Sequence, residues 1–243
     1  MPKKLPKSDF LRFVSRVAGP TLKKHKRAPR LLYGIKGLPD RVRRRHWDLA
    51  AKKFAEVERD ATSRQIQDNQ VQAFITVGEI KANDRITSIG SGTAIMEAFF
   101  AKKLAPQGHV NCVDFSHGMN QIARKTRRMA KAENMHIVDA SGQHLPIAAG
   151  SQDKVIFSNI SFLSKSNWGK MLQESRRVLK KTLDSKIIIL ESNMSVGERI
   201  ALLEENAFEI VRTPSFHYTV PENASHEARR FAHFRLIIAR PKF

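Results

Sequence analysis

The sequence predicts an α/β fold: a doubly wound, mostly parallel sheet with a C-terminal antiparallel hairpin at its edge, plus a basic N-terminal extension. Short apolar runs alternate with helical patterns between residues 86 and 191, which is typical of a parallel sheet covered by helices on both faces. Two later apolar runs, 208–212 and 234–240, are separated by a polar loop rich in histidine, and they predict the hairpin. The 243 residues, of which 41% are hydrophobic, suffice for one sizeable core with attachments.

Residues 1–45 are predicted to form a basic arm. They carry 15 lysine and arginine residues but only two acidic residues, and five prolines interrupt any long helix. One short helical face is apolar and consists of Phe10, Leu11, Val14, Val17 and Ala18. Such a basic amphipathic segment could dock on RNA, on an anionic membrane or on its own domain, and its composition also resembles that of an organellar transit peptide.

Residues 46–80 are predicted to form helices. These helices lead into the domain that contains the sheet, which we assign to residues 81–243. Their apolar residues recur at helical spacing and fall into two groups, so two helices are expected. The first group is Trp47, Ala50, Ala51, Phe54 and Val57, and the second is Ile66, Val71, Phe74, Ile75 and Val77.

A glycine turn follows the first predicted strand. Residues 86–96 read Ile-Thr-Ser-Ile-Gly-Ser-Gly-Thr-Ala-Ile-Met, so Gly90 and Gly92 lie where a strand turns into a helix and the backbone can approach a ligand. Asp114 ends the second predicted strand, and a carboxylate there can accept hydrogen bonds from both hydroxyl groups of a ribose. The nicotinamide fingerprint needs a third glycine where this chain has Ile95. The pattern therefore predicts a nucleoside cofactor site and disfavours a dehydrogenase.

Four more motifs follow along the chain: His-Ile-Val-Asp-Ala at 136–140, Gln-Asp-Lys-Val-Ile-Phe-Ser-Asn at 152–159, Met-Leu-Gln-Glu-Ser-Arg-Arg-Val-Leu-Lys at 171–180 and Lys-Ile-Ile-Ile-Leu-Glu at 186–191. Together with the glycine turn and a Trp-Asp-x-x-Ala-x-x-Phe lead-in at Trp47, the series resembles class I S-adenosylmethionine-dependent methyltransferases. It is nearest to the group that includes the quinone-ring C-methyltransferases and spans roughly residues 47–240. The resemblance implies a methyltransferase domain with S-adenosylmethionine as its cofactor.

By position, the resemblance assigns parts of the cofactor to particular residues. Gly90, Ser91 and Gly92 would bound the methionine part, Asp114 would bind the ribose, Asp139 and Ala140 would hold the adenine edge, Phe115 and Met119 would line the adenine pocket, and Asn159 would lie near the methyl group. An ordinary structural role stays open for single residues, because Asp139 could cap a turn and Phe115 could belong to the core.

The chain departs from the family pattern at two places. Relatives usually carry an acidic residue two positions before the first glycine, where it helps to hold the amino group of the cofactor, and this chain has Ser88 there. The usual Lys-Pro-Gly-Gly turn before the fifth strand is replaced by Lys-Lys-Thr-Leu-Asp-Ser at 180–185. The first departure concerns cofactor affinity, whereas the second is distant from the chemistry.

We assign neither a catalytic residue nor a metal from the sequence. Methyl transfer from a sulfonium is an in-line displacement, so the protein mainly aligns donor and acceptor, and a base is needed only if the acceptor loses a proton. The candidate bases are His144, His217 and Tyr218. Residues 158–162 lack the Asn-Pro-Pro-aromatic pattern of enzymes that methylate exocyclic amines, and Cys112 lies at the cofactor strand, so neither main type of nucleobase methyltransferase is indicated.

Composition also limits the expected compartment. Cys112 is the single cysteine, so the chain can form no internal disulfide and no cysteine-based zinc cluster. No apolar run approaches the ~18 residues of a membrane helix, and the N-terminus lacks a secretory pattern. We expect a soluble protein of the cytoplasm, or alternatively of the mitochondrial or another organellar matrix.

The net charge of +20, from 43 basic and 23 acidic residues, is the main indication of a partner. Besides the arm, cations cluster at 124–128, 176–177 and 229–230. Such clusters suit a phosphate backbone, so RNA or a ribonucleoprotein is the predicted partner, although charge runs are usually solvated helix faces.

Three functions stay open on the sequence alone. The first is a methyltransferase that acts on RNA or is docked to a ribosomal particle. The second is a small-molecule methyltransferase, for instance on a quinone, with the arm holding it at an anionic membrane surface. The third is a methyltransferase-like assembly factor without turnover, which Ser88 motivates. The acceptor atom and the oligomeric state are not determined by the sequence.

Overall fold

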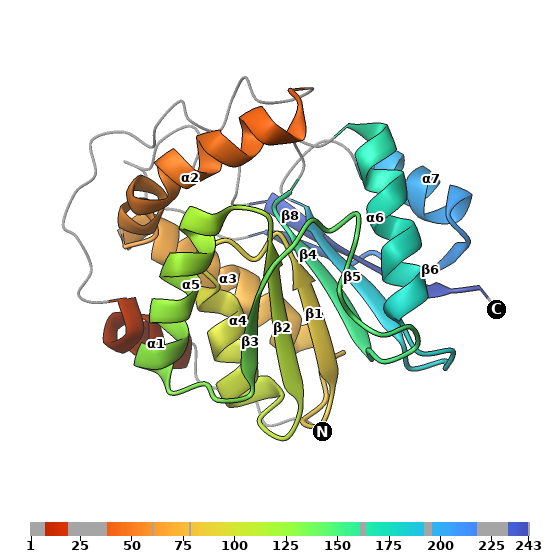
Figure 1. The fold of residues 1–243 in the computed structure, drawn as a ribbon. Coiled ribbons are helices and arrows are strands. Elements are labelled where there is room, and N and C mark those ends of the chain that lie inside the picture. Colours follow the sequence, from red (N-terminus) through yellow and green to blue (C-terminus); the bar gives the residue numbers. More distant parts are fainter. Residues whose placement is uncertain are drawn as a thin grey trace.

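The structure, a computed structural model, describes residues 8–18, 38–59, 61–77, 79–160, 164–191, 196–217 and 233–242. Its centre is an eight-stranded sheet in the order β3-β2-β1-β4-β5-β8-β6, with β7 paired to β8 (Figure 1). The strands are β1 Arg85–Ile89, β2 His109–Asp114, β3 Met135–Asp139, β4 Lys154–Ser158, β5 Lys186–Glu191, β6 Phe208–Arg212, β7 Ser215–His217 and β8 His233–Pro241. The first five strands are parallel, and β8 runs antiparallel to both β5 and β6. The predicted fold class is confirmed.

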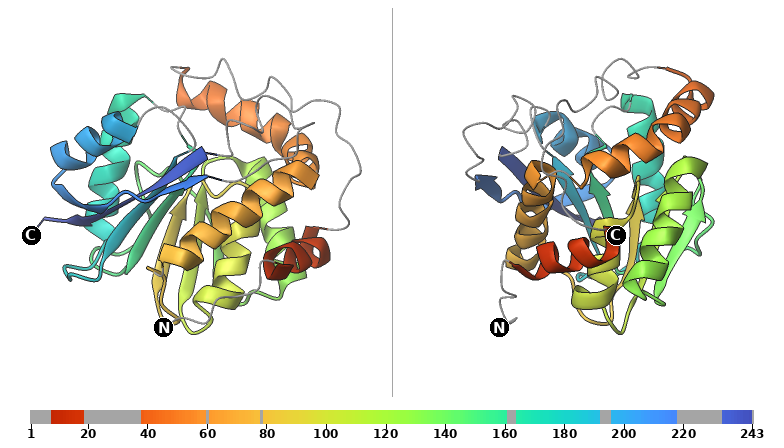
Figure 2. Two further views of the ribbon diagram at one scale, coloured as in Figure 1. Left: turned by 180° about the vertical axis from the view of Figure 1, so that it is seen from behind. Right: turned by 90° about the vertical axis from the view of Figure 1, so that its left-hand side faces the viewer.

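Helices cover both faces of this sheet. They are α1 Ser8–Ala18, α2 Asp40–Val57, α3 Ala61–Val77, α4 Ile95–Phe99 with the π-helical turn η2 Phe100–Leu104, α5 His117–Ala130, α6 Lys165–Val178 and α7 Val196–Glu205. Helices α1, α3, α4 and α5 share one buried apolar cluster, and α6 and α7 share the cluster on the other face. Figure 2 shows α1, α3 and α4 together on one side of the sheet.

Strand β5 shows why the sheet needs both layers. Ile188 packs into the cluster of α1, α3, α4 and α5, whereas its neighbours Ile187 and Ile189 pack into the cluster of α6 and α7. Successive side chains of a strand point to opposite faces, so an uninterrupted run of apolar residues requires cover on both. All six residues of β5 are buried, which agrees with the alternating pattern read from the sequence.

The apolar face of α1 packs against its own domain, one of the docking surfaces that the sequence left open. Phe10, Val14 and Val17 are buried as predicted, and Phe13 is buried too although it was not predicted, whereas Leu11 is only half-buried. The rings of Phe10 and Phe13 lie 5.3 and 5.6 Å from the ring of Phe99, both in edge-to-face geometry. The side chain of Ala18 lies outside the described residues.

The predicted boundary between the arm and the helices, at residue 45, falls inside α2. The helix begins at Asp40, directly after Pro39, whose fixed φ and missing N–H favour a helix start and oppose a helix upstream. Its first turn is basic and polar, so the apolar periodicity that begins at Trp47 marked only the later part. The second predicted helix is α3, which starts at Ala61.

The C-terminal hairpin also contains more than was predicted. Strands β6 and β8 pair at the edge of the sheet, but β8 lies between β5 and β6, and the short β7 adds a second partner to it. The replaced family turn at 180–185 still forms a turn, in which Ser185 N–H donates to the Thr182 carbonyl at 3.1 Å. Among the described helices, none is both long and apolar enough to cross a lipid bilayer.

Candidate functional site

The glycine loop lies at the carboxyl ends of β1 and β2. The N–H groups of Gly90 and Ser91 donate to the Val113 carbonyl at 2.8 and 3.2 Å, so the loop continues the pairing of the two strands. One residue later, Gly92 N–H donates to Asp114 Oδ2 at 2.9 Å. The structure therefore brings the predicted glycines and the predicted carboxylate together at one edge of the sheet.

The two glycines face different surroundings. Both have positive φ, +72° at Gly90 and +56° at Gly92, a backbone conformation that residues other than glycine rarely adopt. A Cβ at Gly90 would lie 2.6 Å from Ile160 Cγ2, whereas no atom of the described residues lies within 4 Å of a Cβ placed at Gly92. The buried hydroxyl of Ser91 has no hydrogen-bond partner among the described residues. The open space beside Gly92 and the unpaired hydroxyl of Ser91 would both suit a ligand that contacts the loop at these two residues.

Asp114 has the properties of a ribose-binding carboxylate. Only 7% of the residue is exposed, and each carboxylate oxygen accepts one backbone N–H, from Gly92 at 2.9 Å and from Ser116 at 2.8 Å. The pKa of Asp114 is raised to about 6: burial is the main cause, the nearby Asp139 and Asp48 also act to raise it, and the two N–H groups act to lower it. Each oxygen keeps a second lone pair, so the carboxylate can also accept hydrogen bonds from a diol.

Asp139 lies opposite Asp114 in the register of β2 and β3. The Asn120 side-chain amide donates both to the Asp114 carbonyl, at 2.8 Å, and to Asp139 Oδ1. Arg124 donates to Asp139 Oδ2 at 2.8 Å, and His117 Nδ1 lies 3.4 Å from the same oxygen. Partial burial acts to raise the pKa of Asp139, but the hydrogen bonds from Arg124 and Asn120 lower it overall. Ala140 joins this edge through its N–H, which donates to the Asp114 carbonyl at 3.2 Å.

Phe115 and Met119 pack against α2. Met119 is buried with Trp47, Ala50 and Ala51, and Phe115 packs partly buried against the same cluster. Helix α2 also supplies Asp48, whose carboxylate accepts from the Ser116 hydroxyl at 2.7 Å and from Gly118 N–H at 2.9 Å at the start of α5. The Trp-Asp lead-in of the sequence thus docks α2 beside the candidate adenine pocket, and Asp48 is a site residue that we did not predict.

Asn159 lies directly after β4 with a positive φ of 56°. Its amide is 3.4 Å from Gln70 Oε1 of α3, and Gln70 is 1% exposed. The amide nitrogen of Gln70 is buried without a hydrogen-bond partner among the described residues. A second unsatisfied polar atom therefore lies near the end of β4, where Asn159 was predicted to approach the methyl group.

Two further buried carboxylates, Glu58 and Glu97, lie behind the glycine loop. The Ser88 hydroxyl donates to Glu97 Oε1 at 2.7 Å, and the Thr93 hydroxyl donates to Glu58 Oε2 at 2.5 Å. Burial raises the pKa of each carboxyl from 4.5 to about 7. Sequence analysis missed both residues, although the serine at position 88 was a signal that a carboxylate had to come from elsewhere.

The candidate bases are not brought together at the loop. His144 is exposed, and His217 is an exposed residue of β7 whose Nδ1 lies 2.6 Å from Nδ1 of His233 on β8. Tyr218 lies outside the described residues, as do Arg229 and Arg230. Within the described part of the chain, no group of His, Cys, Asp and Glu side chains could hold a metal ion.

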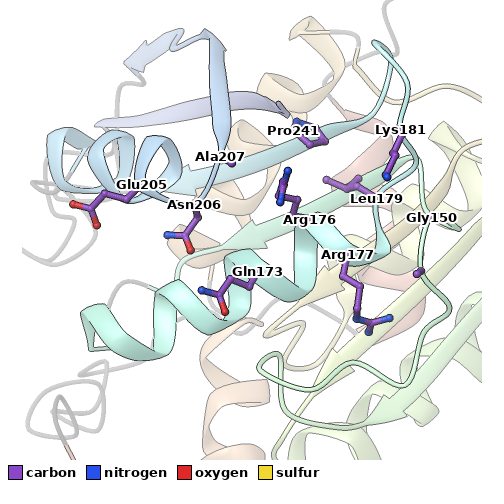
Figure 3. A pocket seen from close by; sticks show the side chains of 11 residues that line it. Gly150, Gln173, Arg176, Arg177, Leu179, Lys181, Glu205, Asn206, Ala207 and Pro241 are labelled. Atoms are coloured by element: carbon purple, nitrogen blue, oxygen red, sulfur yellow. The ribbon is translucent and has the colours of Figure 1, made fainter. Parts of the chain in front are cut away.

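A separate groove of about 870 Å³ lies between the C-terminal parts of α6 and α7 and the end of β8 (Figure 3). Its lining includes Arg176 and Arg177, one of the cation clusters of the sequence. Arg177 is held by Glu174 at 2.7 and 2.8 Å and donates to the carbonyls of Leu145 and Ile147. The guanidinium of Arg177 is therefore occupied by the fold itself.

The comparisons with known proteins show what the middle of this chain is similar to. Residues 86–182 match the family model described as a methyltransferase domain. This range contains the glycine loop and both Asp114 and Asp139. Over residues 86–182 the chain is thus similar to a methyltransferase domain, in agreement with the resemblance read from the sequence.

Curated relatives cover only part of the chain. It is 26% identical over 101 residues to the demethylmenaquinone methyltransferase of Listeria welshimeri, a match that covers 42% of each protein. It is 29% identical over 122 residues to the ubiquinone/menaquinone biosynthesis C-methyltransferase UbiE of Vibrio parahaemolyticus, covering 50% of this chain and 46% of that one. The chain spans less than half the length of these relatives.

Solved structures share the fold over a longer range. An S-adenosylmethionine-dependent methyltransferase from Aquifex aeolicus superposes with a TM-score of 0.59 at 13% identity, covering 79% of this chain and 97% of that one. The cyclase SpnF gives a TM-score of 0.65 at 12% identity, covering 82% and 94%. Because one of these neighbours is named a cyclase, the fold by itself does not determine methyl transfer.

Proposed function

We propose that this protein is an S-adenosylmethionine-dependent methyltransferase whose cofactor binds at the glycine loop and Asp114. The observation that carries the proposal is the meeting of Gly92, with open space beside it, and the Asp114 carboxylate, 2.9 Å apart at the carboxyl ends of β1 and β2. Ligands of open α/β sheets bind at this edge. The matched methyltransferase domain and the predicted cofactor agree with that geometry.

The residues present can hold each part of this cofactor. Asp114 would accept from the ribose hydroxyls, Asp139 lies beside it for the adenine edge, and Ser91 has an unused hydroxyl for the amino-acid part. When bound, the cofactor supplies an activated methyl group on a sulfonium. The protein then contributes mainly by orientation, which can lower the barrier by up to ~7–11 kcal/mol.

Asp114→Asn is expected to weaken binding of S-adenosylhomocysteine by about 10- to 100-fold, because a hydrogen bond to a charged group contributes about 1.5–3 kcal/mol. Asparagine keeps one acceptor for the Gly92 and Ser116 N–H groups, so the loop retains support that alanine would remove. Titration calorimetry measures the effect, and Asp184→Asn, at an exposed turn far from the loop, is the control. Binding that is unchanged in Asp114→Asn would contradict the assignment, and a wild-type protein that binds no adenosyl ligand would leave the assembly factor as the function.

RNA or a ribonucleoprotein is our first candidate for the acceptor or docking partner. The net charge of +20 supports it, and so does α2, whose exposed cations Arg41, Arg44, Arg45 and Lys52 have no ion pair among the described residues. Figure 1 shows α2 along the edge of the molecule where the parallel strands end, beside the proposed cofactor site. A nucleic acid held on α2 would lie beside the candidate adenine pocket, where α2 packs against Met119.

A lipid-soluble ring compound at an anionic membrane is the second candidate. The named quinone methyltransferases among the relatives favour it. So does the outer face of α2, where Val42 is 45% exposed and Leu49 is 78% exposed between the flanking cations. Exposed apolar residues on a basic helix face suit a membrane interface, into which they can insert, whereas binding to a phosphate backbone does not require them.

Two matched variants of α2 distinguish these partners. The triple variant Arg41→Gln, Arg44→Gln, Arg45→Gln removes cations, and the double variant Val42→Ser, Leu49→Ser removes apolar surface. If RNA binds, the plot of log affinity against log salt has a slope near −5 for about six phosphate contacts, and the triple variant reduces its magnitude by about 3 while the double variant binds normally. If a membrane binds, both variants float less with anionic liposomes. A triple variant that behaves as wild type in both assays would contradict docking through α2.

A further inference from the structure

The buried carboxylates of Glu58 and Glu97 have no explanation in the packing of the fold. Glu58 is 8% exposed at the end of α2, and Glu97 is 3% exposed in α4, directly after the glycine loop. No cation forms an ion pair with either one among the described residues, and the groups that donate hydrogen bonds to them are the hydroxyls of Thr93 and Ser88 and the amide of Gln67. Burying two acidic groups close together without a cation is unfavourable.

The surroundings of this pair indicate a polar ligand. Gln67 and Gln70 lie one turn apart on α3, where Gln67 donates to Glu58 at 3.1 Å and Gln70 Oε1 lies 3.4 Å from the Asn159 amide. The amide nitrogen of Gln70, a residue 1% exposed, and the hydroxyl of Ser91 are buried without partners among the described residues. Fixed polar groups that lack partners beside two carboxylates fit a ligand that carries both a cation and hydrogen-bonding groups.

The hydrogen bond between Ser88 and Glu97 connects this pair to the departure seen in the sequence. The methyltransferase pattern places an acid at position 88, where it helps to hold the amino group of the cofactor. Here position 88 is a serine whose hydroxyl contacts the Glu97 carboxylate at 2.7 Å. A carboxylate is therefore still present at this place, but it comes from helix α4, one hydrogen bond away from the strand.

We propose that Glu97, with Glu58 beside it, holds the cationic amino group of the cofactor's amino-acid part, in place of the acid usually found at position 88. This proposal rests on the proposed function and specifies which side chains complete its site. Burial raises the pKa of Glu97 to about 7, and a bound ammonium group would favour the ionised form. Binding near neutral pH should then release protons.

The test compares two ligands that share the adenosyl group. S-adenosylhomocysteine carries the amino acid, and 5′-methylthioadenosine lacks it. In Glu97→Gln we expect the affinity for S-adenosylhomocysteine to fall at least tenfold, while that for 5′-methylthioadenosine stays within about threefold. The wild-type protein at pH 6.5 should release protons on binding S-adenosylhomocysteine, seen as a dependence of the calorimetric enthalpy on the buffer, and Glu97→Gln should release fewer.

A compensating exchange separates a binding role from a structural one. Glu97→Ser alone should lose affinity for S-adenosylhomocysteine, and the double variant Ser88→Asp, Glu97→Ser should recover it to within about threefold, because the carboxylate returns to the strand. Equal losses for both ligands in Glu97→Gln, or an unchanged affinity for S-adenosylhomocysteine, would overturn the proposal while the cofactor site stands. If neither ligand binds to wild-type protein, the proposed function fails and this assignment fails with it.

Discussion

Phe10→Ala is expected to lower the free energy of unfolding by about 3–5 kcal/mol, the range for removing a buried aromatic ring. Phe10 is completely buried, and its ring contacts that of Phe99 edge to face at 5.3 Å, deep in the cluster that α1 shares with α3, α4 and α5. Since small domains are stable by only about 5–15 kcal/mol, the loss would be a large fraction of the total.

Denaturant unfolding followed by circular dichroism measures this effect. Arg12→Ala is the matched control in the same helix, because Arg12 is exposed and, among the described residues, forms an ion pair only with Asp9, at 2.6 Å, and surface ion pairs contribute little. A loss below about 1 kcal/mol in Phe10→Ala would show that α1 is not part of the core. A loss of the expected size would mean that α1 is part of the core. Cleavage of α1 as part of a transit peptide would then expose Phe99 and its neighbours to solvent.

Glu97→Gln is expected to remove about 3 kcal/mol from the change in unfolding free energy between acidic and alkaline pH. Burial raises the pKa of Glu97 from 4.5 to about 7, and each pKa unit corresponds to about 1.4 kcal/mol. The folded protein keeps the Glu97 proton to a higher pH than the unfolded chain does. The unfolding free energy of the wild type therefore falls as pH rises from about 4.5 to about 7 and levels off above that. Glu58 contributes in the same direction.

The measurement is the stability of Glu97→Gln relative to wild type at pH 5 and at pH 8. The variant should be relatively more stable at pH 8, because the wild type must then bury an ionised carboxylate. Glu133→Gln, at an exposed position after α5, serves as the control for the substitution itself. An equal difference at both pH values would contradict a buried carboxyl with a raised pKa. A variant that gains alkaline stability while it binds S-adenosylhomocysteine less well would show that Glu97 is kept for function at the expense of stability.

The sequence predicted most of the sheet because each strand has a local signature. The run Ile187 to Leu190 is apolar at every position, which only a strand covered on both faces needs, and glycine at positions 90 and 92 marked the end of β1. The arm was harder to assign, since Pro39 and the basic first turn of α2 hid the true start of that helix. The amphipathic pattern around Phe10 was compatible with docking on RNA, on a membrane or on the protein's own domain. In the structure this face packs against Phe99 of the same domain.

The candidate site divides in the same way. Gly92 and Asp114 could be found from the sequence because a parallel sheet puts the ends of neighbouring strands side by side. Asp48 and Gln70 could not, because they come from helices whose approach to the loop depends on how α2 and α3 pack. No spacing rule links Gln70 to Asn159, which is 89 positions later.

By itself, the sequence determined a doubly wound, mostly parallel sheet with a C-terminal hairpin at its edge, the glycine turn and the carboxylate that follows the second strand. Only the tertiary structure decided that α1 belongs to the core and that a buried glutamate meets the serine at position 88. The physical reason is range: strand periodicity and turn chemistry depend on neighbours in the chain, whereas burial and pairing of charged side chains depend on segments that folding brings together from far apart.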